Sequence, residues 1–595
     1  MRLSPLDWAA ILAYLLISLL LGLYFRRRSA ASTEEYFVSG RRASWWLAGT
    51  SMVATTFAAD TPLVVSGLVY TQGIAGNWLW WSALPSGILT VFLYARLWHR
   101  AGLLTDVQFA ELRYAGRPAA VLRGFRALYL GLLMNCLILG WVTKAMMQIA
   151  SVSLGISDSS ALALCIFVLI PLTGIYSSLG GLWGVLWTDL FQFVLMMTII
   201  VVVAVYAVGA VGGMPALLDK LEAARVAGGG AASDATAFLP DFSRGLTGEA
   251  RWTLPLLTFL VFLTVQWWAA WYPGAEPGGG GYVAQRIFST RSEREGLLSV
   301  LWFNVAHYAI RPWPWILVGL TAVVLYPNLT RSSAESSYML VATNHLPPAL
   351  RGLLVAGFLA AFMSTVATHL NWGSSYLVSD FYRRFVRTAA AERHYVHVGR
   401  LVTLLFVVLT GIVSWQLASI REGWKFVLEV GAGTGAVYLL RWYWWRINAW
   451  SEIAAMSTAL LVSVGLRWAQ PFSGPEFLVF AKNALVTTGV TTLVWLAVTL
   501  VTPPEPAGVL LNFYRRVRPD VTGWGPVALA ASDVAPTHDL VRNLLSWLLG
   551  CGMVYSALFA IGRLCFGHYP KATQSLAIFV FCTILLVRRL RVSPT

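Results

Sequence analysis

The chain alternates between long apolar stretches and short polar segments, many of which contain clustered arginines. An apolar stretch of about 20 residues is long enough for a helix to cross the ~30 Å hydrocarbon core of a bilayer. The pattern therefore predicts an all-α protein that crosses the membrane many times. The expected spans are residues 7–25, 45–72, 78–98, 122–152, 160–177, 184–211, 252–273, 299–326, 349–381, 397–418, 424–446, 449–467, 477–502, 539–563 and 572–588.

A charge and a proline interrupt the second of these spans. Asp60 and Pro62 lie near its middle. Proline has no N–H group, so the carbonyl of Ala58, four residues earlier, loses its helical partner. Carbonyls left free at membrane depth are tolerated only beside a cavity or a ligand. We therefore expect the helix to be unwound here and to face a binding site.

The seventh span ends in a similar interruption. Its aromatic residues run into Pro273, Glu276 and Pro277, and four glycines follow at 278–281. Broken helices at matching places in two halves indicate a transporter site. Each broken helix opens a group of five spans, and an odd number inverts the topology of the second group. The sequence thus predicts a five-plus-five inverted repeat with one leading and about four trailing helices.

This repeat divides the chain into parts with different roles. A long outer loop separates the two repeats, and a proline-rich inner loop lies among the trailing helices. The expected parts are 1–44 (leading helix and inner loop), 45–211 (first repeat), 212–251 (outer loop), 252–446 (second repeat) and 447–595 (trailing helices, with the inner loop at 503–538). Neither loop has the length or pattern of a separate catalytic domain.

Composition and charge support a membrane protein. Of the 595 residues, 57% are hydrophobic and 12% are charged, whereas soluble proteins carry about 25% charged residues. This composition excludes a soluble enzyme and a disordered scaffold. The net charge of +16 does not indicate nucleic-acid binding, because the arginines concentrate in alternate gaps between spans. That bias predicts an outer N-terminus and a cytoplasmic C-terminus in the plasma or inner membrane.

Five motifs, in order along the chain, resemble the sodium:solute symporter family, which has the LeuT-type fold. They are residues 35–46, 102–117, 180–192, 284–286 and 360–382. The third contains the paired glycines followed by Thr-Asp and Gln that mark the family. The resemblance covers roughly residues 7–450 and implies a secondary active transporter that couples a small polar solute to sodium by alternating access.

The resemblance also implies a sodium site. In the family, backbone carbonyls of the first broken helix and hydroxyls of a later helix bind the ion. The matching positions here are Ala54 and Phe57 on the first helix and Ala361, Ser364 and Thr365 on the other. The last three positions share one helical face, and an all-oxygen ligand set suits a hard cation. The competing interpretation is that both hydroxyls bond only to their own helix.

A family carboxylate near the inner end of the sodium path matches Asp189. The alternative role for Asp189 is a cap or a structural partner of a loop arginine.

The solute is expected between the two broken helices. Ionisable residues inside a membrane span are functional suspects, and the aromatic residues beside them could instead face lipid. The candidate contacts are Asp60, Thr61, Trp267, Trp268, Trp271, Glu276 and Glu429. Lys144, in the middle of the fourth span, is a possible charge partner of Asp60 or Glu429, or a contact for an anionic solute.

Three alternatives remain open at this point. In the first, a transporter of the same fold is coupled to protons or works without a cation. The second and third belong to other functional classes, namely a transporter-like sensor and a membrane enzyme. No motif of a membrane enzyme is present in the sequence, so the sequence favours transport. The expected partners are a small solute, sodium and the lipid bilayer, and a single chain is sufficient for the predicted mechanism.

Overall fold

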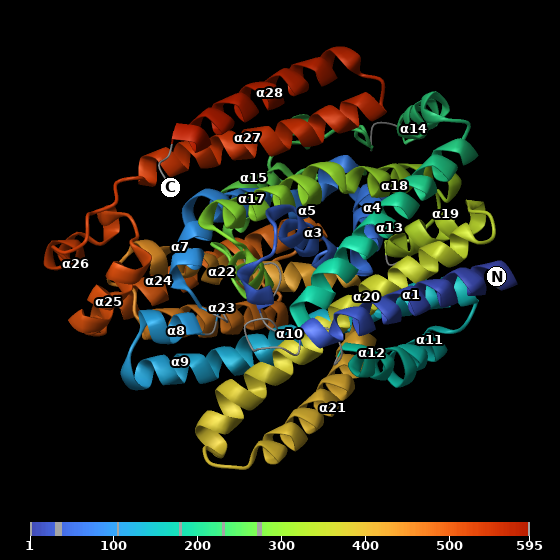
Figure 1. Cartoon of the computed structure of the whole chain (residues 1–595). Coiled ribbons are helices and arrows are strands. Elements are labelled where there is room, and N and C mark those ends of the chain that lie inside the picture. Colours follow the sequence, from blue (N-terminus) through green and yellow to red (C-terminus); the bar gives the residue numbers. More distant parts are fainter. Residues whose placement is uncertain are drawn as a thin grey trace.

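The computed structural model describes residues 3–29, 38–103, 106, 108–177, 181–228, 232–269, 276–331 and 333–592. Within these ranges the protein is built of helices, and β-structure is limited to three isolated bridges (Figure 1). Each of the fifteen expected spans coincides with one helix or a run of consecutive helices. In the described part, ten helices are long and apolar enough to cross a membrane, and one bent pair gives an eleventh span.

The leading helix and the first group of spans occupy the chain up to residue 210. Several spans contain a short π-helical turn, which widens the helix by one residue. The elements are α1 (Pro5–Ser29), η1 (Ser39–Arg41), α3 (Trp45–Thr55), α4 (Asp60–Gln72), η2 (Ile74–Asn77), α5 (Trp78–Trp81), α6 (Leu84–Leu89), η3 (Thr90–Tyr94), α7 (Ala95–Ala101), α8 (Gln108–Arg113), α9 (Gly116–Leu128), η4 (Tyr129–Met134), α10 (Asn135–Leu154), α11 (Asp158–Leu164), η5 (Cys165–Leu169), α12 (Ile170–Ser177) and α13 (Gly181–Ala210).

A loop and a further group of helices follow, up to residue 443. The loop contains a helix of its own, and the second broken helix consists of α15 and η7 on one side of the glycines and α16 on the other. The elements are α14 (Met214–Ala227), η6 (Phe242–Arg244), α15 (Leu256–Thr264), η7 (Gln266–Trp268), α16 (Gly281–Ser289), α17 (Glu293–Asn304), η8 (Val305–Ile310), α18 (Pro312–Leu325), η9 (Ala334–Ser336), α19 (Ser337–His345), α20 (Leu350–Ser375), η10 (Tyr376–Val386), α21 (Glu392–Gln416) and α22 (Ile420–Tyr443).

The trailing elements complete the chain. The last two helices, α27 and α28, lie side by side along one edge of the molecule (Figure 1). The elements are α23 (Ala449–Ala469), α24 (Glu476–Val501), α25 (Ala507–Val517), η11 (Val521–Gly523), α26 (Gly525–Ala530), α27 (Leu540–Cys565) and α28 (Tyr569–Val592).

Local sequence signals explain where several spans begin. Ser292 and Ser419 precede α17 and α22, and each side chain accepts a hydrogen bond from a backbone N–H in the first turn of its helix. Asn448 and Ser451 form a reciprocal capping box at α23. Such caps satisfy N–H groups that have no partner within the helix. They fix the ends of the spans that surround the central site.

The first broken helix lies at the centre of the packing. α3 packs against α13, α17 and α20, and α4 packs against α18. Helices from three other spans therefore pack around the interruption between α3 and α4, since α17 and α18 belong to one span. The interruption is buried, which agrees with its predicted role as a site.

Candidate functional site

The interruption of the first broken helix extends over four residues. α3 ends at Thr55, α4 begins at Asp60, and the two axes differ by 64°. The N–H of Phe57 still donates to the carbonyl of Ala54 at 3.0 Å, and Thr61 N–H donates to Ala58 at 3.4 Å. The chain thus turns sharply at the point that Pro62 predicts.

A π-helical turn faces this interruption. In η8 the N–H of Arg311 donates to the carbonyl of Ala306, five residues earlier, at 3.1 Å. Pro312 starts α18 directly afterwards, and its missing N–H favours an irregular turn at this position. The wider turn places His307, Tyr308 and Arg311 toward the first broken helix, where all three line one cavity.

Arg311 contacts the end of α3 directly. Its Nη1 donates to the carbonyl of Val53 at 3.3 Å and to Thr56 Oγ1 at 3.4 Å. Thr56 Oγ1 also hydrogen-bonds to His307 Nδ1 at 3.2 Å. The guanidinium carbon lies 5.2 Å from the ring centre of Phe57 and 5.0 Å from that of Trp315, distances at which a ring face attracts a cation.

These residues enclose a cavity of about 20 Å³. A single water molecule needs roughly 10–15 Å³, so the cavity has room for little more than one water. The cavity of this structure is therefore too small to hold a solute. A solute fits only after the surrounding helices move apart. The lining residues are Thr56, Thr61, Trp80, Ala83, His307, Tyr308, Arg311, Trp424 and Leu428.

Asp60 lies beside this cavity and is 2% exposed. Its Oδ2 accepts a hydrogen bond of 2.8 Å from Trp424 Nε1, on α22. Lys144, on α10, forms no ion pair with Asp60 or Glu429 among the described residues. The structure thus gives Asp60 an indole partner where the sequence suggested a lysine.

The positions expected to hold sodium come from helices that pack together. α20 carries Ala361, Ser364 and Thr365, and it packs against α3, which carries Ala54. Thr365 Oγ1 donates to the carbonyl of Ala361 at 2.9 Å. This is the bond back to its own helix that the competing interpretation requires, although a hydroxyl oxygen that donates one bond keeps lone pairs for a cation.

Asp189 joins the same region. It is 2% exposed, and its Oδ2 accepts a bond of 2.5 Å from Ser51 Oγ on α3. The Ser364 hydroxyl lies close enough to interact with the Asp189 carboxylate. The carboxylate that matches the sodium path therefore lies near a predicted sodium ligand.

A buried arginine completes this cluster. Arg286 on α16 has an Nη2 atom 3.8 Å from Asp189 Oδ2, and its Nε donates to Ser51 Oγ at 3.2 Å. Its Nη2 also donates to Thr55 Oγ1 at 3.4 Å. Both broken helices thus meet at Asp189.

Glu276 belongs to a separate ion-pair cluster, which we call the inner cluster. It consists of Glu276, Glu452, Arg126 and Arg441, all buried. Arg126 bonds to Glu276 at 2.6 Å and to Glu452 at 3.0 Å, and Arg441 bonds to the same two carboxylates at 3.2 Å each. The cluster joins the linker of the second broken helix to α9, α22 and α23.

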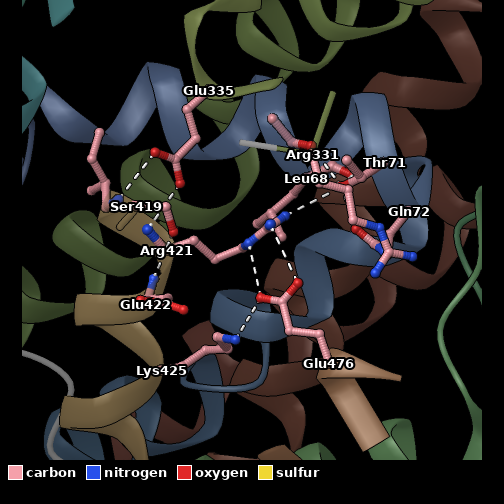
Figure 2. Close-up of polar contacts among 12 residues, drawn as sticks. Leu68, Thr71, Gln72, Arg331, Glu335, Ser419, Arg421, Glu422, Lys425 and Glu476 are labelled. Carbon is pink, nitrogen blue, oxygen red and sulfur yellow. Dashed lines mark hydrogen bonds and ion pairs between the residues drawn. The ribbon is translucent and has the colours of Figure 1, made fainter. Parts of the chain in front are cut away.

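A second cluster lies at the N-terminal end of α22, whereas the inner cluster contains Arg441 near the C-terminal end of that helix. Arg421 lies between Glu335 and Glu476 (Figure 2). Its side chain pairs with Glu476 at 3.4 Å, its backbone N–H donates to Glu335 at 2.9 Å, and Lys425 bonds to Glu476 at 2.5 Å. Arg421 also donates to Thr71 at the end of α4, at 3.3 Å. This outer cluster, formed by Thr71, Glu335, Arg421, Lys425 and Glu476, links α4 to α22 and α24.

The other predicted solute contacts lie in different surroundings. Trp268 donates to the carbonyl of Ala432 at 3.0 Å, and the Trp267 ring packs 5.6 Å from that of Trp547. Glu429 bonds to Arg467 at 3.3 Å. Trp271 lies outside the described residues. Among the predicted contacts that the structure describes, only Thr61 lines the cavity, with Asp60 next to it.

The sequence interpretation did not single out Arg311. The signal was present, since an arginine followed directly by a proline stands inside the apolar stretch 299–326. His307, in the same apolar stretch, also lies on the cavity wall.

Comparisons with known proteins agree on one family. The model of the sodium:solute symporter family matches residues 36–459. The sodium/glucose cotransporter of Vibrio parahaemolyticus is 24% identical over 497 residues, which cover 80% of this chain and 87% of that protein. The sodium/sialic acid symporter SiaT of Proteus mirabilis (strain HI4320) is 23% identical over 509 residues, covering 82% and 94%.

A solved structure shares the fold. The substrate-bound outward-open state of a Na⁺-coupled sialic acid symporter aligns with a TM-score of 0.64 at 18% identity, covering 84% of this chain and 99% of that one. This likeness confirms the LeuT-type architecture expected from the motifs. The family match spans most of the chain and both broken helices, and the chain therefore belongs to the sodium:solute symporter family.

Proposed function

We propose that the protein imports a small polar solute together with sodium by alternating access, and that it transports its solute without altering it chemically. The observation that supports this function is the small central cavity between the first broken helix and the π-helical turn of η8. Such a cavity admits a solute only when one side of the protein opens. Sodium is the coupling ion of the family.

The proposed sodium site lies beside this cavity. Its ligands are the carbonyls of Ala54 and Phe57 with Ala361, Ser364 and Thr365 of α20, and Asp189 provides the path toward the cytoplasm. The hydrogen bond of 2.5 Å from Ser51 to Asp189 and the proximity of Ser364 to Asp189 support this assignment. The proposed solute site is the cavity with Asp60 and Thr61. The roles of Trp267, Trp268, Trp271, Glu276 and Glu429 as direct contacts remain proposals.

We propose that the protein lies in the plasma or inner membrane. Its N-terminus is outside the cell and its C-terminus is in the cytoplasm. Arginines concentrate on the cytoplasmic side in this orientation, as the positive-inside rule requires. The outer cluster then closes the outside of the cavity, and the inner cluster closes the cytoplasmic side. We further propose the division into residues 45–211 and 252–446 as the two inverted repeats.

Thermal unfolding of the purified protein tests the coupling ion. A ligand that binds the folded state raises its melting temperature. We expect NaCl to raise it relative to KCl and choline chloride at equal ionic strength, and we expect Ser364→Ala/Thr365→Ala to remove that difference. A double variant with the full sodium response would refute the site. A response to pH in place of sodium would favour coupling to protons.

A further inference from the structure

Arg311 is a buried cation with an unused hydrogen-bonding edge. It is 0% exposed. Its Nη1 makes the two long bonds to α3, whereas Nε and Nη2 have no hydrogen-bond partner. In the part of the chain that the structure describes, no carboxylate oxygen forms an ion pair with Arg311. Burying a charge without such a partner is costly, and this favours a site that a ligand completes.

The other buried arginines of this region are paired within the protein. Arg126 and Arg441 each contact two carboxylates in the inner cluster. Arg286 lies 3.8 Å from Asp189. Arg311 differs from all three, and it is also the charged residue that lines the central cavity.

The two atoms without a partner, Nε and Nη2 of Arg311, are the pair through which an arginine can bind both oxygens of a carboxylate. Elsewhere in this chain, Arg100 binds Glu293 through Nε at 3.0 Å and Nη2 at 3.2 Å. Arg225 binds Glu222 through the same two atoms, at 2.7 and 2.6 Å. The planar fork of the guanidinium matches the two oxygens of a carboxylate. Arg311 therefore presents the edge that arginine uses for bidentate binding.

The other walls of the cavity suit the apolar part of an organic molecule and not a bare ion. Trp80, Tyr308 and Trp424 supply aromatic faces, and Leu428 supplies an apolar one. Trp80 and Tyr308 stack with their ring centres 5.7 Å apart. Such walls contact a small apolar group, whereas orientation comes from a few polar atoms.

We propose that Arg311 binds the carboxylate of the transported solute through Nε and Nη2, which makes this protein a transporter of small organic carboxylates. The proposal rests on the proposed function, because it assigns the solute of that site. Asp60 lies near enough to interact with the charge of Arg311 but forms no ion pair with it in the described structure. The solute's carboxylate supplies the direct partner for Nε and Nη2. Co-transported sodium balances the charge of the anion during transport.

Matched acid and amide pairs test this directly with the wild-type protein. The thermal unfolding of the purified protein would be measured in NaCl with pyruvate, L-lactate and L-proline, and with lactamide, L-prolinamide and D-glucose. We expect at least one carboxylate to raise the melting temperature and its amide to leave it unchanged. Stabilisation by D-glucose or an amide to the same extent as by the acids would overturn the proposal. L-Proline and L-lactate distinguish a zwitterion from a simple anion.

Variants then locate the binding group. Arg311→Lys keeps the charge and loses the planar fork, so the Kd for the carboxylate should rise about tenfold or more. Arg311→Gln should abolish binding. Arg100→Lys is the matched control, since it changes the same bidentate geometry at the partly exposed pair with Glu293, and its Kd should equal that of the wild type. Unchanged affinity in Arg311→Gln would also overturn the proposal.

Repeating the titration in KCl separates this inference from the proposed function. Carboxylate binding that does not depend on sodium would contradict sodium symport and leave the role of Arg311 intact. Sodium-dependent binding of D-glucose without carboxylate binding would support symport and refute the role of Arg311.

Discussion

At the residue scale, the central site depends on a few buried polar groups that meet from distant parts of the chain. Asp60 bonds to Trp424, and Thr56 bonds to His307 and Arg311. A buried polar group that loses its partner carries the full cost of desolvation. Substitutions here should therefore affect neighbouring groups in a coupled manner.

Asp60 should act together with Trp424 and independently of Lys144. Asp60→Asn removes the charge near Arg311 and keeps an oxygen that can accept the indole N–H. We expect solute uptake to fall by about tenfold or more, with insertion and folding preserved. The combination with Trp424→Phe should lose less than the sum of the single changes, and the combination with Lys144→Met should be additive. An additive Trp424 pair would contradict the contact.

Asp189 and Ser364 should be coupled in their effect on sodium. Asp189→Asn keeps the shape of the side chain and removes its charge, and Ser364→Ala removes its hydrogen-bond donor. Each should raise the sodium concentration needed for half-maximal uptake. Because the two residues lie close enough to interact, the double variant should resemble the more severe single variant. Sodium activation curves identical to those of the wild type would exclude Asp189 from the sodium path.

At the scale of elements, close helix packing holds the broken helix in place. Gly49 on α3 faces α17, where an added Cβ would lie 2.5 Å from the carbonyl oxygen of Ser299 and 2.9 Å from the Trp302 ring. Real Cβ atoms do not approach backbone so closely. The absence of a side chain at Gly49 therefore sets the distance between α3 and α17.

Gly49→Ala should force α3 and α17 apart. Overpacking of a tight interior contact costs about 1–3 kcal/mol, so we expect a lower melting temperature and reduced uptake. Gly209→Ala is the matched control. Gly209 lies within α13 and has open space where a Cβ would be, and alanine stabilises a helix interior by roughly 0.5–1 kcal/mol relative to glycine. Equal melting temperatures for the two variants would contradict the packing argument.

At the scale of the whole molecule, the ion pairs of the inner and outer clusters are both formed while the central cavity is too small for a solute. The outer cluster joins α4, in the first broken helix, to α22 and α24. The inner cluster joins Glu276, in the linker of the second broken helix, to α9, α22 and α23. In a two-state transporter, weakening one closure shifts the population toward the state that is open on that side. The two clusters should therefore bias the protein in opposite directions.

Glu476→Gln should favour opening to the outside, and Glu276→Gln should favour opening to the cytoplasm. Ala83 lines the cavity, so Ala83→Cys provides a site for a membrane-impermeant thiol reagent. We expect faster labelling from outside in the Glu476 variant and faster labelling from inside in the Glu276 variant. The five native cysteines can also react with the reagent. Their labelling is measured in the same variants without the Ala83→Cys change and is subtracted. Equal rates from both sides in both variants would exclude the two clusters as gates.

The sequence by itself determined the features that depend on neighbouring residues. Apolar length predicted the spans, Pro62 predicted the broken helix, and ordered motifs predicted the family. These are local properties, because hydropathy and a missing N–H act within one turn or one span.

Only the tertiary structure decided which side chains meet. Arg311 and Thr56 are separated by 255 residues and Asp60 and Trp424 by 364, and their contacts depend on how α3, η8 and α22 pack. Glu276 was an equally good candidate from its position in the sequence, yet packing gave it two arginine partners. A one-residue widening of the helix at η8 directs Arg311 into the cavity, and no local pattern in the sequence specifies such convergence between distant helices.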